Sequence, residues 1–160
     1  MKPKTYVCAG LGLLVVAFSA LYYPAVGEFT GLYCAPRKLH DIRPPAESAS
    51  PEEVVRAYLR AVMARDLDTA RHLSTSEFAD REESVYDSSF CDWTSLGAVT
   101  VWPAHPDVDG TGRYTTVMRV SVELELQTRG RDASEDFSWG YLLERASPKE
   151  RWRIFDSGEG

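Results

Sequence analysis

Residues 114–126 have the sequence YTTVMRVSVELEL, in which two kinds of side chain alternate almost without interruption. One set is mostly apolar and comprises Tyr114, Thr116, Met118, Val120, Val122, Leu124 and Leu126. The other set is mostly polar and includes Arg119, Ser121, Glu123 and Glu125. Because successive side chains of a strand point to opposite faces, the pattern predicts a long strand with one buried face and one wet face. Such a strand is typical of an antiparallel sheet that covers a core on one side.

The flanking segments favour further strands joined by turns. Residues 94–102 are rich in β-branched and apolar side chains, and the prolines at 103 and 106 end that strand. Residues 109–112 (DGTG) are typical of a turn. A third strand is expected after the charged loop 130–136, and a fourth near residues 152–154. The third strand would present its alternating apolar residues Phe137, Trp139, Tyr141 and Leu143 to the core.

Helices are expected ahead of these strands. Ser50 is a favourable N-cap, Pro51 suits the first helical position, and Glu53 completes a capping box. Apolar residues then recur at helical spacing, at positions 54, 55, 58, 59, 62 and 63. This helix should run from Pro51 to about Arg65, and shorter helices should begin near Asp66 and Thr75.

Helices followed by antiparallel strands predict an α+β domain over residues 50–160. Its helices would pack on one face of a curved antiparallel sheet. Two arrangements of the space between the layers stay open at this point, a roomy cavity or a core filled by Val55, Tyr58, Leu59, Trp139 and their neighbours.

The N-terminus carries a different signal. Residues 5–27 form a run of 23 uncharged residues, which is long enough for a transmembrane helix. Lys2 and Lys4 precede the run and Glu28 follows it, so the positive-inside rule places everything after residue 27 outside the cytoplasm. Residues 1–27 are therefore expected to anchor a single-pass protein in the cell membrane through residues 5–27. The alternative is a cleaved signal peptide and a secreted product, because residues 25–27 (AVG) suit a cleavage site.

Residues 28–49, which mix Gly, Pro, Ser and charged residues, are expected to form an extracytoplasmic linker. Cys34 and Cys91 are the only cysteines outside the apolar run. Outside the cytoplasm thiols tend to oxidise, so we expect a Cys34–Cys91 disulfide that joins linker and domain. Free or intermolecularly paired thiols are the alternative, because sequence does not determine connectivity.

Charge and residue spacing exclude several functions. The chain has 18 Lys and Arg against 24 Asp and Glu, a net charge of −6, and no dense basic run, which disfavours nucleic-acid binding. His40, His72 and His105 are isolated, and neither they nor Cys34 and Cys91 show metal-ligand spacing. No metal and no cofactor are expected.

Three stretches together resemble one superfamily. They are PEEVVRAYLRAV at residues 51–62, DLDTARHL at 66–73, and RWRI at 151–154 followed by Asp156, Ser157 and Gly158. Their order and pattern, over residues 50–158, resemble the nuclear-transport-factor-2-like superfamily, also called cystatin-like or SnoaL-like. The resemblance implies a cone-shaped fold with a pocket between helices and sheet. That superfamily includes ketosteroid isomerases, polyketide cyclases and many non-catalytic members, among them bacterial envelope proteins with one N-terminal span.

Two functions remain open. The first is a non-catalytic binding or scaffold domain on the outer face of the cytoplasmic membrane, with a protein partner in the cell envelope. The second is a small-molecule pocket of the isomerase or cyclase type, in which the resemblance implies an Asp base and a Tyr or Asp donor. The pocket candidates are Tyr58, Asp92, Tyr114 and Tyr141, with His72 as a further one. Their ordinary roles would be core aromatics for the tyrosines, a turn or cap for Asp92, and a helix end for His72.

Overall fold

The computed structural model describes residues 37–84, 89–107 and 116–159. The apolar run 5–27, Cys34 and Tyr114 lie outside these ranges, so the expectations attached to them stay predictions. None of the described helices combines the length and the apolar character that crossing a membrane requires. The described residues belong to one compact unit, Pro36–Gly160.

Helix α2, Pro51–Ala64, begins and ends as its sequence predicts. The Ser50 side chain accepts the Glu53 N–H at 3.3 Å, and the Glu53 carboxylate accepts the Ser50 N–H at 2.8 Å, so the capping box is confirmed. Arg65 ends the helix in the left-handed conformation, with φ of 57°. The apolar stripe of α2 is buried, with Val55 and Val62 fully covered.

Three short helices follow α2. They are α3 (Leu67–His72), α4 (Ser76–Ser84) and α5 (Ser89–Asp92). Asp66 is the N-cap of α3, where its side chain accepts the Thr69 N–H. The helix α5 was not expected from the sequence.

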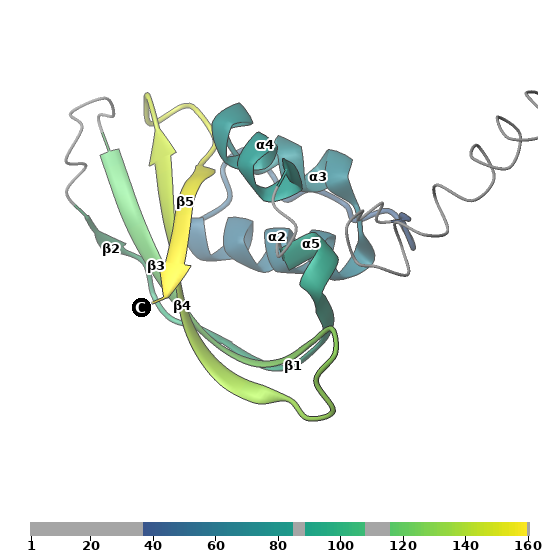
Figure 1. Ribbon diagram of the computed structural model, residues 1–160. Coiled ribbons are helices and arrows are strands. Elements are labelled where there is room, and N and C mark those ends of the chain that lie inside the picture. The colour runs from purple at the N-terminus through teal and green to yellow at the C-terminus, as the bar shows by residue number, and fades with distance from the viewer. Residues whose placement is uncertain (1–36, 85–88, 108–115, 160) are drawn as a thin grey trace, which may run out of the picture. The chain divides into compact units, whose positions relative to one another are not determined.

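The strands form one antiparallel sheet. They are β1 (Trp93–Val101), β2 (His105–Pro106), β3 (Thr116–Thr128), β4 (Glu135–Arg145) and β5 (Arg153–Glu159). The order is β1-β3-β4-β5, and β2 also pairs with β3. Figure 1 shows the helices on one side of the sheet, which bends around them. An α+β domain with helices packed on an antiparallel sheet is thus confirmed.

Burial along β3 follows the predicted alternation over most of its length. Val120, Val122, Leu124 and Leu126 are buried, whereas Glu123 and Glu125 are exposed. Near the start of the strand the alternation of buried and exposed side chains does not hold, because Val117 on the polar face is also buried.

Aromatic rings fill the space between α2 and the sheet. The Tyr58 ring lies edge-on to Phe78, Phe90 and Tyr141, with centroid distances of 5.9, 6.4 and 5.8 Å. Val55 and Leu59 are buried beside it, and Trp139 is partly buried against the same core. The layer between helices and sheet is therefore a packed core, which is the second of the two arrangements that the sequence left open.

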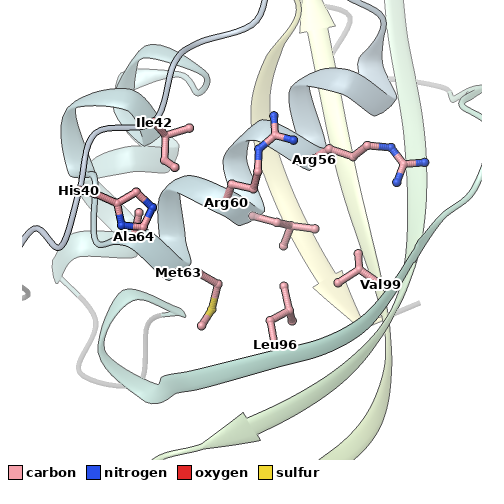
Figure 2. A pocket seen from close by; sticks show the side chains of 9 residues that line it. His40, Ile42, Arg56, Arg60, Met63, Ala64, Leu96 and Val99 are labelled. Carbon is pink, nitrogen blue, oxygen red and sulfur yellow. The ribbon is translucent and has the colours of Figure 1, made fainter.

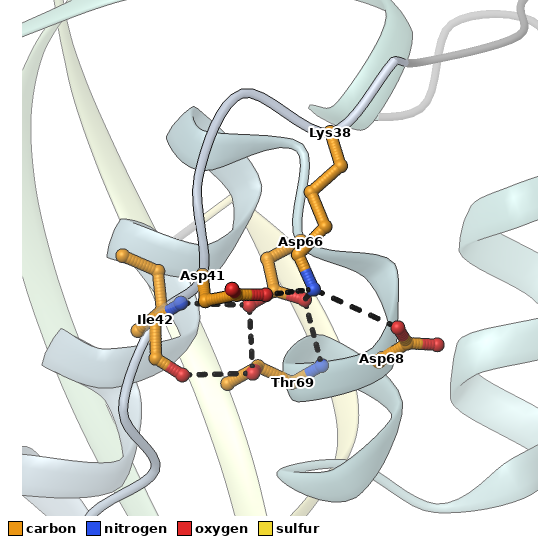
Figure 3. Close-up of polar contacts among 6 residues, drawn as sticks. All are labelled: Lys38, Asp41, Ile42, Asp66, Asp68 and Thr69. Carbon is orange, nitrogen blue, oxygen red and sulfur yellow. Dashed lines mark hydrogen bonds and ion pairs between the residues drawn. The ribbon is translucent and has the colours of Figure 1, made fainter.

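Residues 38–42, which we call the strap, were expected to belong to a linker. They are instead bonded to the helical layer. The Leu39 N–H donates to the Ala64 carbonyl at 2.8 Å, and the Ile42 N–H donates to the Asp66 carboxylate at 2.8 Å. The Thr69 hydroxyl donates to the Ile42 carbonyl at 3.0 Å, as Figure 3 shows. Residues 38–42 are therefore part of the domain.

Candidate functional site

A groove with a cavity volume of about 450 Å³ lies between α2, β1 and the strap. Figure 2 shows the side chains that line it. They are Arg56, Leu59, Arg60, Met63 and Ala64 from α2, Leu96 and Val99 from β1, and His40 and Ile42 from the strap. We call this site the α2–β1 groove.

The helical wall of the groove follows from helix periodicity. Positions 56, 59, 60 and 63 are spaced by three and four residues, so their side chains share one face of α2. This face lies beside the buried stripe that carries Val55 and Tyr58. Leu59 belongs to both, because it is buried in the core and also lines the groove.

The sheet wall depends on an irregularity in β1. Leu96 and Val99 are three positions apart, which would put them on opposite faces of a regular strand. The register shifts between their partners, since Leu96 pairs with Leu126 and Val99 with Leu124. The irregularity brings both side chains to the groove. Gly97 lies within it, and a Cβ atom there would approach the Glu125 Oε2 atom to 2.5 Å.

The third wall is held by one buried carboxylate. His40 and Ile42 line the groove from the strap, and Asp66 binds the strap from beneath. The Asp66 side chain is 1% exposed and also forms an ion pair with the Lys38 Nζ atom at 2.9 Å. Burial alone would raise the pKa of Asp66, but hydrogen bonds from Ile42, Lys38 and Thr69 outweigh burial and hold it well below its usual range.

Two cationic side chains flank the apolar floor of the groove. Arg56 and Arg60 are both exposed, and Figure 2 shows them along α2, across from Leu96 and Val99. Arg56 donates to the Val101 carbonyl at 3.3 Å. Within the described ranges Arg60 makes no hydrogen bond and no ion pair. The groove therefore offers hydrocarbon at its floor and positive charge at its rim.

Of the predicted pocket candidates, two meet in the core. Tyr58 and Tyr141 are each 2% exposed and in ring contact. Burial raises the pKa of both hydroxyls, and the neighbouring Glu82 carboxylate raises them further. The Tyr58 hydroxyl makes no hydrogen bond within the described residues, although the Ser89 hydroxyl, which donates to Glu82 at 3.1 Å, is near enough to lower its pKa slightly.

The remaining candidates do not join this pair. Asp92 ends α5, where its backbone carbonyl accepts the Arg129 N–H at 2.7 Å, and no described contact links its carboxylate to Tyr58 or Tyr141. His72 ends α3 in contact with Arg151, and partial burial together with that guanidinium lowers its pKa. Tyr114 lies outside the described residues. The described part of the chain therefore brings together no carboxylate and tyrosine of the predicted set.

The cysteine prediction is tested on one side only. Cys91 is buried in α5 and is disulfide-bonded. Its partner lies outside the described residues, as does Cys34. The Cys34–Cys91 pairing stays a prediction.

Metal ligands do not gather in the described ranges, where no three His, Cys, Asp or Glu side chains are placed to hold an ion. A second hollow lies on the sheet between β1, β3 and β4, with the acidic residues Glu123, Glu125 and Asp136 in its lining. An acidic hollow of this kind is most simply a solvated sheet face.

The sequence analysis missed the residues that form the groove. Arg56 and Arg60 are four apart and lie beside Leu59 and Met63, so an apolar strip with two arginines was visible in the helix pattern. Leu96 and Val99 gave no such signal, because their common direction depends on a local irregularity in β1.

Comparison with known proteins adds no relative. No family of proteins matches the chain, and neither a curated protein nor a solved structure matches it.

Proposed function

We propose that this chain is a non-catalytic binding protein whose α+β domain takes an apolar ligand in the α2–β1 groove. The observation that carries the proposal is the contrast between two spaces beside α2. Tyr58, Phe78, Phe90 and Tyr141 fill the space between helix and sheet, whereas the groove on the adjacent face is open. Ligand sites are typically apolar hollows of this size with a few polar groups at their edge.

The order of helices and strands supports placing the domain in the nuclear-transport-factor-2-like superfamily. The pocket that such a fold implies would be the space that the aromatic rings occupy here. The groove is then a separate site, between α2, β1 and the strap. We further propose that residues 5–27 display the domain on the outer face of the cytoplasmic membrane, on the sequence evidence of length and flanking charge.

Blocking the groove tests the proposal. The full chain would be held in phosphatidylcholine nanodiscs and irradiated with a photoreactive dodecanol, and the labelled peptides would be identified by mass spectrometry. We expect adducts at Met63, Leu96 or Val99. In Val99→Phe the photolabelling of the groove should fall at least tenfold, because the larger side chain fills the groove. Thr100→Phe is the matched control, since Thr100 lines the other hollow of the sheet. Equal labelling in Val99→Phe and wild type would refute the groove as the site.

A second candidate function is favoured by one observation. The buried Tyr58 hydroxyl has no partner among the described residues, and a small polar ligand in the core would supply one. This reading keeps a small-molecule pocket of the isomerase or cyclase kind as the alternative. A Tyr58→Phe substitution tests whether that hydroxyl has a partner in the folded protein.

A further inference from the structure

We infer that the α2–β1 groove selects an anionic amphiphile with a single acyl chain, such as a fatty acid, and that Arg56 and Arg60 bind its carboxylate. The inference rests on the proposed function, because it names the ligand class of the same groove.

The floor of the groove matches an acyl chain. Leu59, Met63, Ala64, Leu96 and Val99 present only hydrocarbon and a thioether to the cavity. The unbranched Met63 side chain adapts to irregular apolar surfaces. A peptide in this place would leave most of its backbone N–H and C=O groups without partners on the floor, which is costly, whereas an acyl chain has no such groups.

The rim of the groove matches a carboxylate. The lining includes Arg56, Arg60 and His40 but no acidic residue, although Asp and Glu outnumber Lys and Arg in the whole chain. Glu52 lies one helical turn before Arg56 and accepts the Ala104 N–H at 2.6 Å, and its carboxylate also attracts Arg56, so the charge of Arg56 is partly compensated. An anion at the rim would therefore meet the positive charge of Arg60, which forms no ion pair within the described ranges, together with the partly compensated charge of Arg56.

The side chains of Arg56 and Arg60 are suited to bind a carboxylate. A guanidinium group presents a planar fork of N–H donors that matches a carboxylate. Arg60 has no partner within the described ranges, and Arg56 has one bond to the Val101 carbonyl at 3.3 Å. Their spacing of four residues puts both forks on one side of α2, one helical turn apart.

A matched pair of probes tests this inference. The full chain in phosphatidylcholine nanodiscs at pH 8 would be labelled with photoreactive dodecanoic acid and with photoreactive dodecanol at equal concentrations in the discs. We expect the acid to label Met63, Leu96 or Val99 at least tenfold more strongly than the alcohol does. Arg60→Gln, and more completely the double variant Arg56→Gln/Arg60→Gln, should reduce acid labelling to the alcohol level. Arg153→Gln removes the same charge from the exposed β5 position outside the groove and should change neither value.

The outcomes separate the inference from the proposed function. Equal groove labelling by acid and alcohol, with both lost in Val99→Phe, would overturn the inference and leave the apolar site in place. Labelling that is unchanged in Val99→Phe would overturn both the inference and the proposed function. Failure of dodecanoic acid to label the groove, with labelling by a photoreactive acidic peptide instead, would overturn the choice of an acyl ligand. Thermal unfolding followed by circular dichroism would verify that each variant is folded.

Discussion

The Asp66 carboxylate accepts the backbone N–H of Ile42 at 2.8 Å, across 24 positions of the chain. The same side chain caps α3, so one buried residue both starts a helix and holds the strap. Because Ile42 and its neighbour His40 line the groove, this bond fixes one wall of the proposed binding site.

Replacing Asp66 should therefore be costly. In Asp66→Asn an amide NH₂ group replaces one carboxylate oxygen and faces the donors of Ile42, Thr69 or Lys38. We expect the free energy of unfolding to fall by about 2–3 kcal/mol, measured by urea denaturation. Asp68→Asn is the control, because the Asp68 side chain is 89% exposed and 3.7 Å from the same lysine. That control should change the stability by less than about 0.5 kcal/mol. Equal losses in the two variants would contradict the role assigned to Asp66.

The same carboxylate should make stability depend on pH. Its pKa is lower in the folded than in the unfolded chain, because its hydrogen bonds outweigh the effect of burial. A lowered folded pKa stabilises the protein above the unfolded pKa, about 4 for Asp, and this contribution is lost as the pH falls below it. The difference in unfolding free energy between wild type and Asp66→Asn should thus be largest near neutral pH and shrink between about pH 5 and pH 3. A difference that stays constant over this range would argue against an ionised Asp66.

The Tyr58 hydroxyl should contribute nothing to stability. It is buried without a described partner, so Tyr58→Phe should leave the free energy of unfolding unchanged or raise it by up to about 1 kcal/mol. Tyr58→Leu is the contrast, since it removes three edge-on ring contacts and should cost about 2–4 kcal/mol. A loss above about 1 kcal/mol in Tyr58→Phe would mean that the hydroxyl has a hydrogen-bond partner in the folded protein.

The irregularity in β1 should depend on Gly97. A Cβ atom there would lie 2.5 Å from the Glu125 Oε2 atom and would displace that carboxylate from its 2.7 Å bond with the Ser134 hydroxyl. Gly97→Ala should lower the free energy of unfolding by about 0.5–1 kcal/mol, because the nearest clashing atoms are the end of an exposed, flexible side chain that loses one hydrogen bond as it moves. Gly158→Ala is the matched strand control, because a Cβ atom at Gly158 meets nothing within 4 Å. Similar stability of the two variants in thermal denaturation would show that the close approach at Gly97 is unimportant.

Local patterns in the sequence predicted most of the fold. The capping box at Ser50 and the alternation from Val120 to Leu126 are short-range signals, and both appear in the structure as expected. The strap and α5 could not be predicted, because residues 38–42 acquire their place only through distant partners such as Ala64 and Asp66. Backbone groups form several of the hydrogen bonds that hold the strap. Such bonds leave no pattern in the sequence, so the strap has the composition of a linker.

The candidate site was less accessible to sequence reasoning. The sequence suggested Tyr58 and Tyr141 as pocket residues because they are polar aromatics, but the structure places both in a packed core. The groove instead needs three elements to meet, and Leu96 and Val99 share a wall only through a register shift. Such a site becomes visible when tertiary pairing is known.

Methionine methyl NMR tests the central claim most directly. The chain has three methionines, of which Met63 lines the groove. Met118 lies on β3, six residues or about 20 Å along the strand from Leu124, which pairs with Val99, and it serves as an internal control. Dodecanoate would be titrated into the full chain, ¹³C-labelled at its methionine methyl groups, in phosphatidylcholine nanodiscs. The account predicts a saturable shift of the Met63 methyl signal with no change at Met118, and loss of that shift in Arg56→Gln/Arg60→Gln. A Met63 signal that stays still while ligand saturates the protein, or a shift confined to Met118, would contradict it.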